Sequence, residues 1–345
     1  MKLPRITAKF RVVTPLMLHG VNKNRVELRI PSIKGALRYW YRAANPDYKD
    51  TVDSLGITQE EYLFGGANGK AGQSAFLMRL SKKPKGNPKF FTNKSFEIEF
   101  LLRPNLKQEA TPDWRGLLVS IWLLGHFGGV GAKVRRGYGM IALEEWRAEY
   151  CEKLQSMIEE DFPILHNAKS PEDWEEKLEK CWKNIVANRD SHDEQEHSIL
   201  DHYSSLYVSK VKVQNTGDAR KEGADLIQAF CSENKIDAAI FGVPRPYEDQ
   251  EPPKSQRSNW KSSKKKKNAQ IWLNPTDCKR IPSPVWLKVF KINGQYHSAF
   301  LFLTTKCPKE LRLGKKQQKV NYAGAIQSFK DQLKQKQYRR VCGYE

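Results

Sequence analysis

The sequence lacks several patterns that mark common classes of protein. Its six cysteines are scattered and form no CxxC pair, which argues against a zinc ribbon and fits reduced thiols. No segment approaches the roughly 20 apolar residues of a membrane span, and the first residues contain no apolar stretch of signal-peptide length. A GxxxxGK[ST] phosphate loop is also absent. We therefore expect a soluble cytoplasmic protein with no cofactor and no membrane partner.

Signs of catalysis and of metal binding are equally sparse. His192, His197 and His202 recur every five residues, so on a helix they would point in different directions and could not share a metal. No nucleophile elbow and no carboxylate pair is evident. His19 follows the first predicted strand, where a general base for RNA cleavage could sit. We expect no catalytic residue and no metal site, and keep a His19 endoribonuclease as an alternative.

Positive charge is abundant and unevenly distributed. The net charge is +20 and the isoelectric point is about 9.6. Residues 1–150 and 201–345 carry the excess of lysine and arginine, whereas residues 151–200 are net acidic. The aromatic content of 11% argues against a disordered polycation. This distribution predicts two basic modules that face a polyanion, joined by an acidic connector.

The first 148 residues show the pattern of a ferredoxin-like module. Apolar and polar residues alternate in the stretches that we expect to be strands, and apolar residues recur at helical spacing in the stretches between them. The predicted order is strand 5–13, helix 33–44, strand 75–80, strand 95–102, a helix that begins at Thr111-Pro112-Asp113, and strand 138–143. This βαββαβ order places the chain in the α+β class.

The rest of the chain is predicted to form a connector and a second module. Residues 149–201 have a charged, largely helical pattern with two tryptophans, which indicates a packed connector. Residues 202–345 contain a hairpin turn at Asn293-Gly294 and an amphipathic helix at 322–335, but no evident last strand. We therefore expect a second, degenerate ferredoxin-like module, with a basic mobile loop at about 248–269.

A glycine-rich segment is the main candidate binding site. Residues 128–139 read GGVGAKVRRGYG, with the cations Lys133, Arg135 and Arg136. Glycines allow a backbone to expose N–H groups that bind phosphate, and the cations supply matching charge. The segment follows a helix and precedes a strand, which is the reverse of a dinucleotide-binding loop. The alternative is a flexible hairpin with solvated charges.

A second candidate lies on the helix at 33–44. Ile33, Leu37, Trp40 and Ala44 share one face, and a cationic ridge stacks on another. The ridge consists of Lys34, Arg38 and Arg42. We expect these side chains to contact phosphates, although such a ridge can also be an ordinary solvated face.

Five segments of the chain resemble the RAMP superfamily of CRISPR proteins. These are PSIKGALRYWYRA (31–43), EYLFGG (61–66), WLLGHFGGVGAKVRRGYG (122–139), FGVPRP (241–246) and SPVWLKV (283–289). More narrowly, they are similar to the first-numbered subunit of the Cmr, or type III-B, effector complex. The resemblance implies tandem ferredoxin-like modules and a non-catalytic subunit that holds guide RNA, target RNA or both, beside other Cmr subunits.

The resemblance also implies which residues contact RNA. From the glycine-rich segment these are Gly129, Gly131, Lys133, Arg135, Arg136, Gly137 and Gly139, and from the helix Lys34, Arg38 and Arg42. We further expect Tyr138, Trp40 or Tyr41 to stack on a base. A structural module whose charge docks acidic partner subunits remains the third hypothesis.

Overall fold

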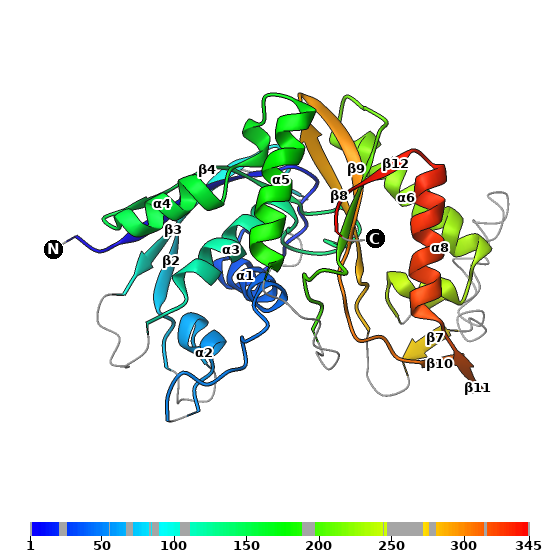
Figure 1. Cartoon of the computed structure of the whole chain (residues 1–345), viewed down its shortest axis with the longest axis horizontal. Coiled ribbons are helices and arrows are strands. Elements are labelled where there is room, and N and C mark those ends of the chain that lie inside the picture. Colours follow the sequence, from blue (N-terminus) through cyan, green and yellow to red (C-terminus); the bar gives the residue numbers. More distant parts are fainter. Residues whose placement is uncertain are drawn as a thin grey trace.

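The computed structural model places two modules side by side with helices packed between and around them (Figure 1). It describes residues 2–20, 26–54, 56–66, 72–82, 84, 90–103, 111–187, 197–243, 245–246, 272–275, 281–313 and 316–343. The predicted basic loop at about 248–269 lies outside these residues. No helix among them is long and apolar enough to cross a membrane.

The first module is a ferredoxin-like βαββαβ unit, as predicted. Its elements are β1 (Arg5–Val12), α1 (Ile30–Ala44), β2 (Phe76–Lys82), β3 (Ser95–Leu102), α3 (Trp114–His126) and β4 (Ile141–Glu149). The strands pair antiparallel in the order β2-β3-β1-β4. The apolar residues of β1 all face the helices, because the alternating pattern places them on one side.

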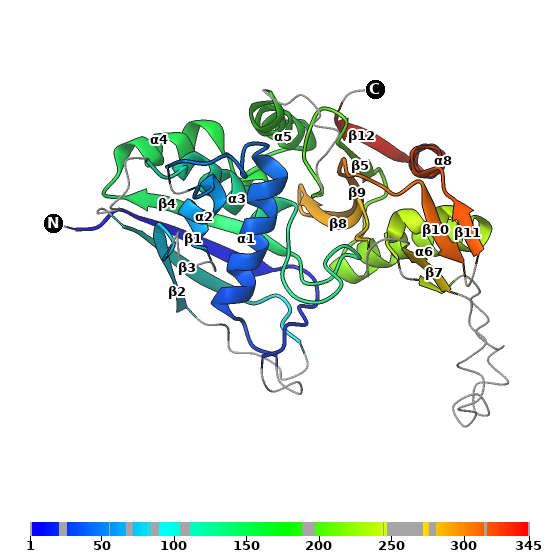
Figure 2. The same ribbon diagram turned by 90° about the horizontal axis from the view of Figure 1, so that it is seen from below.

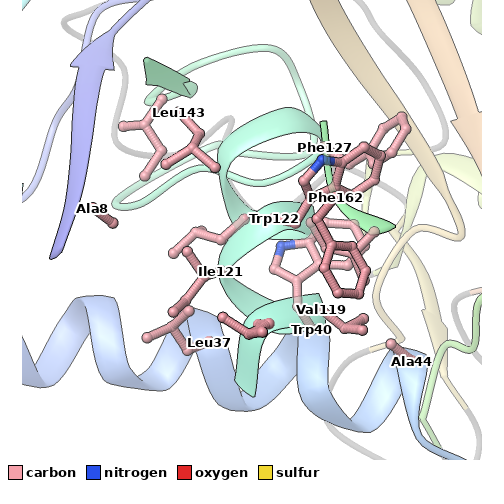
Figure 3. Packing of buried hydrophobic residues seen from close by; sticks show 14 of the residues in the cluster. Ala8, Leu37, Trp40, Ala44, Val119, Ile121, Trp122, Phe127, Leu143 and Phe162 are labelled. Atoms are coloured by element: carbon pink, nitrogen blue, oxygen red, sulfur yellow. The ribbon is translucent and has the colours of Figure 1, made fainter. Parts of the chain in front are cut away.

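Two helices cover one face of this sheet and build its core. The face of α1 that carries Leu37, Trp40 and Ala44 packs against Val119 and Trp122 of α3 (Figure 3). Residues 117–126 of α3 are all buried, as their apolar composition predicts. The side chain of Asp113 caps this helix by accepting a hydrogen bond from Gly116 N at 2.8 Å.

A short helix, α2 (Gln59–Phe64), includes the first four residues of the EYLFGG segment (61–66). Thr58 and Glu61 form a capping box at its start, a signal that was present in the sequence. The glycines that follow end the helix at Phe64. This helix brings Glu60 against α1.

The connector packs on both modules. It comprises α4 (Glu152–Asp161), the 3₁₀ turn η1 (Leu165–Asn167) and α5 (Pro171–Val186). Trp174 and Trp182 of α5 are buried in the same apolar core as α3 and the second module. Trp174 contacts Phe290 with ring centroids 5.3 Å apart.

The second module has the same topology as the first. Its main elements are β5 (Ser205–Ser209), α6 (Thr216–Glu233), β8 (Val285–Ile292), β9 (Gln295–Phe302), α8 (Tyr322–Gln335) and β12 (Tyr338–Cys342), with the strands in the order β12-β5-β9-β8. The predicted hairpin at Asn293-Gly294 joins β8 to β9. The module is therefore less degenerate than the sequence suggested, because β12 completes the sheet.

Two features of this module were not foreseen. Strand β12 escaped prediction because its register shifts between Arg340 and Cys342, which breaks the alternation of buried and exposed residues. A small additional sheet lies at the far end of the module. It consists of β6 (Arg245–Pro246), β7 (Trp272–Pro275), β10 (Glu310–Leu313) and β11 (Lys316–Lys319). The 3₁₀ turn η2 (Asp237–Phe241) precedes β6 in the chain.

The two modules share one continuous core. Helices α6 and α8 cover one face of the second sheet, and the opposite face packs toward the first module (Figure 2). Trp286 and Phe290 on that face contact Trp40 and Phe127, with ring centroids 5.4 and 5.8 Å apart. The chain between α3 and β4, which contains the glycine-rich segment, crosses toward the second module at this seam.

Candidate nucleic-acid interface

The glycine-rich segment (residues 128–139) is a tightly anchored loop. Val130 N donates a hydrogen bond to Gly139 O, Ala132 N to Met17 O and Gly139 N to Pro15 O, at 2.9 to 3.0 Å. Gly139 has φ +62°, and a Cβ there would clash with the carbonyl oxygen of Val130. The loop is therefore not a flexible hairpin.

The predicted glycine contacts divide into two groups. Gly129, Gly137 and Gly139 are buried, so their contribution is the shape of the loop. Gly131 is exposed, and its φ of +95° turns the chain toward the tip of the loop.

The tip of the loop presents backbone amides. Lys133 has φ +60°, a left-handed conformation, and its carbonyl accepts a hydrogen bond from Arg136 N at 2.9 Å. Within the described part of the chain, no acceptor engages the amides of Lys133, Val134 and Arg135. Consecutive free amides around a left-handed residue form a concave site that suits an anion.

The three cations of the loop occupy different environments. Lys133 and Arg136 are exposed. Arg135 points into the seam, where its Nη1 donates to Ser283 O at 3.0 Å and its guanidinium lies 4.9 Å from the Trp286 ring. Two cations are thus available to an external anion, and the third also links the modules.

The loop extends the second sheet. Leu287 N donates a hydrogen bond to Arg135 O at 3.0 Å, and Arg136 forms a parallel bridge with Leu287 at the edge strand β8. From α6, the guanidinium of Arg220 lies 4.4 Å from the half-buried ring of Tyr138. Residues of both modules therefore surround the tip of the loop.

A cleft of about 520 Å³ opens between the loop and the second module. The cations of the loop line one side, and mostly apolar residues line the other. Its lining residues are Gly131, Lys133, Val134, Arg135, Arg136, Ile227, Phe241, Gly242, Val243, Ile281, Pro282, Ser283, Val285 and Trp286. We refer to this as the inter-module cleft.

The helical ridge on α1 is not a free cationic face. Arg38 Nε donates to Glu60 Oε1 at 2.6 Å, and Arg42 donates to both Glu60 oxygens at 2.7 Å. Burial raises the pKa of Glu60, but the hydrogen bonds from Arg42 and Arg38 outweigh it and hold that pKa below its usual value. Lys34 Nζ donates to Ser74 Oγ at 3.0 Å, and burial lowers its pKa.

The sequence did not reveal Glu60 as the partner of this ridge, because the pairing depends on how α2 packs against α1. The side chains of Arg38 and Arg42 remain 32% and 38% exposed, so part of each side chain is accessible. Their contact with RNA stays a prediction.

The prediction of base stacking was wrong for two of its three residues. Trp40 and Tyr41 are 1% and 0% exposed, because both lie in the core of the first module. Only Tyr138 among the three is partly accessible. The sequence also gave no role to Arg220 and Lys288, although Lys288 lies within the SPVWLKV motif.

The remaining candidate residues are histidines. His19 is exposed and pairs through its backbone with Val26. Among the described residues, no group of three or more histidine, cysteine, aspartate or glutamate side chains could hold a metal ion. His192 lies outside the described residues.

A known protein family and a known protein are similar to this chain in sequence. Residues 9–142 match the model of the RAMP superfamily. The chain is 24% identical to the CRISPR system Cmr subunit Cmr1-1 of Pyrococcus furiosus over 259 residues, which cover 66% of this chain and 73% of the relative.

Solved structures share the fold over nearly the whole chain. The apo crystal structure of Cmr1 from Pyrococcus furiosus matches with a TM-score of 0.57 and 16% identity, covering 98% of this chain and 99% of the other. A chain of the type III-B Cmr-beta complex bound to cognate target RNA matches with a TM-score of 0.60 and 12% identity, covering 97% and 99%. The first module thus carries the RAMP superfamily pattern, and the whole chain is a tandem ferredoxin-like protein that resembles Cmr1.

Proposed function

We propose that this chain is a non-catalytic RNA-binding subunit of a type III-B Cmr complex, in which it contacts guide RNA, target RNA or both and neighbouring Cmr subunits. The observation that carries the proposal is the tip of the glycine-rich loop. The amides of Lys133, Val134 and Arg135, which have no acceptor among the described residues, and the exposed side chains of Lys133 and Arg136 lie together on one side of the inter-module cleft. Such a combination binds phosphates without reading sequence.

The outer face of the first sheet is a poorer candidate for RNA. In RNA-recognition modules of this topology, aromatic side chains on the central strands stack on bases. Here Phe10 and Phe96 on the central strands β1 and β3 are buried against the helices. The outward residues of β1 are instead paired with carboxylates, because Lys9 binds Glu145 and Arg11 binds Glu144 at 2.8 and 2.7 Å.

The relatives support the partners in this proposal. The matched Cmr-beta structure contains cognate target RNA, and the sequence relative carries the name of a Cmr subunit. The excess of 20 positive charges fits a polyanionic environment in a cytoplasmic ribonucleoprotein. Sequence specificity would then come from guide pairing, so this chain should bind single strands with little sequence preference.

Single-stranded RNA binding across a salt series tests the proposal. The variant Lys133→Ala/Arg136→Ala should bind more weakly, and the slope of log K against log salt should become shallower by about 1.4, at ~0.7 per phosphate contact. Arg135 is left intact because it also holds the modules together.

A matched control removes the same charge elsewhere. Lys153→Ala/Lys169→Ala changes two exposed lysines of the acidic connector and should leave the slope near the wild-type value. Equal binding by all three proteins would contradict the assignment of RNA to the loop. Specific cleavage of repeat RNA that disappears in His19→Ala would contradict the non-catalytic role.

A further inference from the structure

Lys288 occupies an unusual position in the seam between the modules. It lies on β8 between Trp286 and Phe290, whose side chains face the first module. The residue is 0% exposed, and its Nζ has no hydrogen-bond partner in the described part of the structure. A buried ammonium without a partner is costly, so such a lysine is either uncharged or incomplete without a ligand.

The described surroundings of Lys288 are rich in hydrogen-bond donors. Its Nζ lies 4.5 Å from the Trp286 ring, and the guanidinium of Arg135 lies 4.9 Å from the same ring. Helix α1 contributes Tyr39, and the segment before β5 contributes His197, whose ring is tilted against that of Tyr39 with centroids 4.6 Å apart. Burial, and then the charge of Arg135, hold the pKa of Lys288 well below its usual value.

Other donor groups surround Trp286. Its Nε1 atom is buried and has no hydrogen-bond partner among the described residues, and the buried hydroxyl of Tyr39 lies beside the side chains of Ser198 and Arg135. All of these groups can donate a hydrogen bond. A set of donors with two basic side chains is the chemistry of an anion site.

This cluster adjoins the inter-module cleft. Arg135 and Trp286 line the cleft. Lys288 does not line the cleft but lies beside the Trp286 ring. An anion that binds Arg135 at this wall would cancel the repulsion that Arg135 exerts on Lys288 and would add an attraction across a region of low dielectric.

We propose that Arg135 and Lys288 form a two-cation subsite for one phosphate group of the RNA, and that Lys288 is an uncharged amine until the phosphate arrives and then takes up a proton from solvent. The inference rests on the proposed RNA-binding function and assigns one phosphate to the inner wall of the cleft. Lys288 acts as an electrostatic partner of Arg135. The bound state holds more protons than the free state, so affinity must rise as pH falls.

Calorimetry of wild-type protein with a single-stranded RNA oligonucleotide, in two buffers of different ionisation enthalpy at pH 8, measures this uptake directly. We expect an uptake that approaches one proton per bound RNA. The variant Lys288→Met keeps the length of the side chain and removes its amine. We expect this variant to bind the RNA about tenfold more weakly at pH 7. We also expect it to take up fewer protons on binding, because the proton that Lys288 accepts is missing. Thermal unfolding establishes that the variant is folded.

Lys291→Met is the matched control, because it makes the same change three residues along β8 at an exposed position outside the cleft. It should bind and take up protons like the wild type. Absence of proton uptake by the wild type overturns the inference whether or not Lys288→Met folds. If Lys288→Met binds and takes up protons like the wild type, while Lys133→Ala/Arg136→Ala binds weakly, the RNA site stands and the Lys288 subsite is wrong.

Discussion

Leu287 N donates a hydrogen bond to the carbonyl oxygen of Arg135 across the seam between the two modules. The glycine-rich loop of the first module thereby continues the edge strand of the second sheet, and the edge that β8 would otherwise expose is covered. The position of the candidate phosphate site is consequently set by both modules at once. A change that loosens this seam should affect stability and RNA binding together.

Arg135 and Arg136 are neighbours in sequence with different roles. Arg135→Ala removes the hydrogen bond to Ser283 O and the contact with Trp286, so we expect it to lower the free energy of unfolding by about 1–2 kcal/mol. Arg136→Ala removes the same charge from an exposed side chain and should change that energy by less than about 0.5 kcal/mol. Urea unfolding of both variants measures the difference, and equal effects would argue against a structural role for Arg135.

Gly139 shapes the loop through its backbone. Gly139→Ala places a Cβ against Val130 O in a left-handed conformation, so it should destabilise the protein by about 2 kcal/mol or more. Gly35→Ala in α1 is the matched change, because its Cβ meets nothing within 4 Å. A helical alanine should stabilise the protein by about 0.5–1 kcal/mol. Opposite shifts in the unfolding midpoint are expected, and a neutral Gly139→Ala would show that the loop can adopt another conformation.

Glu60 holds Arg38 and Arg42 on α1. Glu60→Gln removes the charge from a carboxylate that is 7% exposed and accepts three hydrogen bonds, so we expect a loss of about 1–3 kcal/mol in urea unfolding at pH 7. The exposed pair of Glu179 and Lys183 provides the comparison, and Glu179→Gln should cost less than about 0.5 kcal/mol.

The same carboxylate predicts a pH dependence with a definite sign. The pKa of Glu60 is lower in the folded state than in the unfolded state. The contribution of the carboxylate to the free energy of unfolding is therefore fully present above the ordinary glutamate pKa and is lost as pH falls through the lowered pKa. The stability difference between wild type and Glu60→Gln should therefore shrink below about pH 4.5. A difference that stays constant from pH 7 to pH 3 would rule out the carboxylate as its source.

His166 should make stability fall in mild acid. Burial, with Arg11 and Lys291 nearby, lowers the pKa of His166 to about 4, and neither ring nitrogen has a partner among the described residues. Between about pH 6.5 and pH 4 the unfolded state therefore binds a proton at this histidine and the folded state does not. The free energy of unfolding is unaffected by His166 above about pH 6.5 and decreases toward pH 4, by up to about 1.4 kcal/mol per pH unit. His166→Phe keeps the ring stacked on His126 and should flatten this slope, as urea unfolding at pH 7, 6 and 5 would reveal.

The exposed His19 supplies the control for that experiment. His19→Gln removes a histidine that does not lie in the core and should leave the pH slope of the wild type in place. If His166→Phe and His19→Gln have the same slope as the wild type, the acid sensitivity belongs to other groups, among which His126 has a pKa lowered by burial to about 3.

Several elements could be predicted from the sequence because their signals are local. The strand at 95–102 and the helix at 322–335 agree with β3 and α8, since each has a clear hydrophobic period. Helix α2 was not among the predicted elements, although the capping box of Thr58 and Glu61 was readable in the sequence. Strand β12 was missed because a bulge removed its alternation.

Sequence patterns alone predicted the βαββαβ order of the first module, the buried face of α1 and the glycine-rich loop as the candidate site. Hydrophobic periodicity, capping residues and glycine spacing act over a few residues and can be seen in one stretch of chain. Tertiary contacts were needed to establish that Arg38 and Arg42 bind Glu60, that Arg135 points into the seam, and that Lys288 is buried beside Arg135. These facts depend on contacts between residues 18 to about 150 positions apart in the sequence. The charge of a side chain on a helix or strand does not specify which distant part of the chain will pack over that side chain.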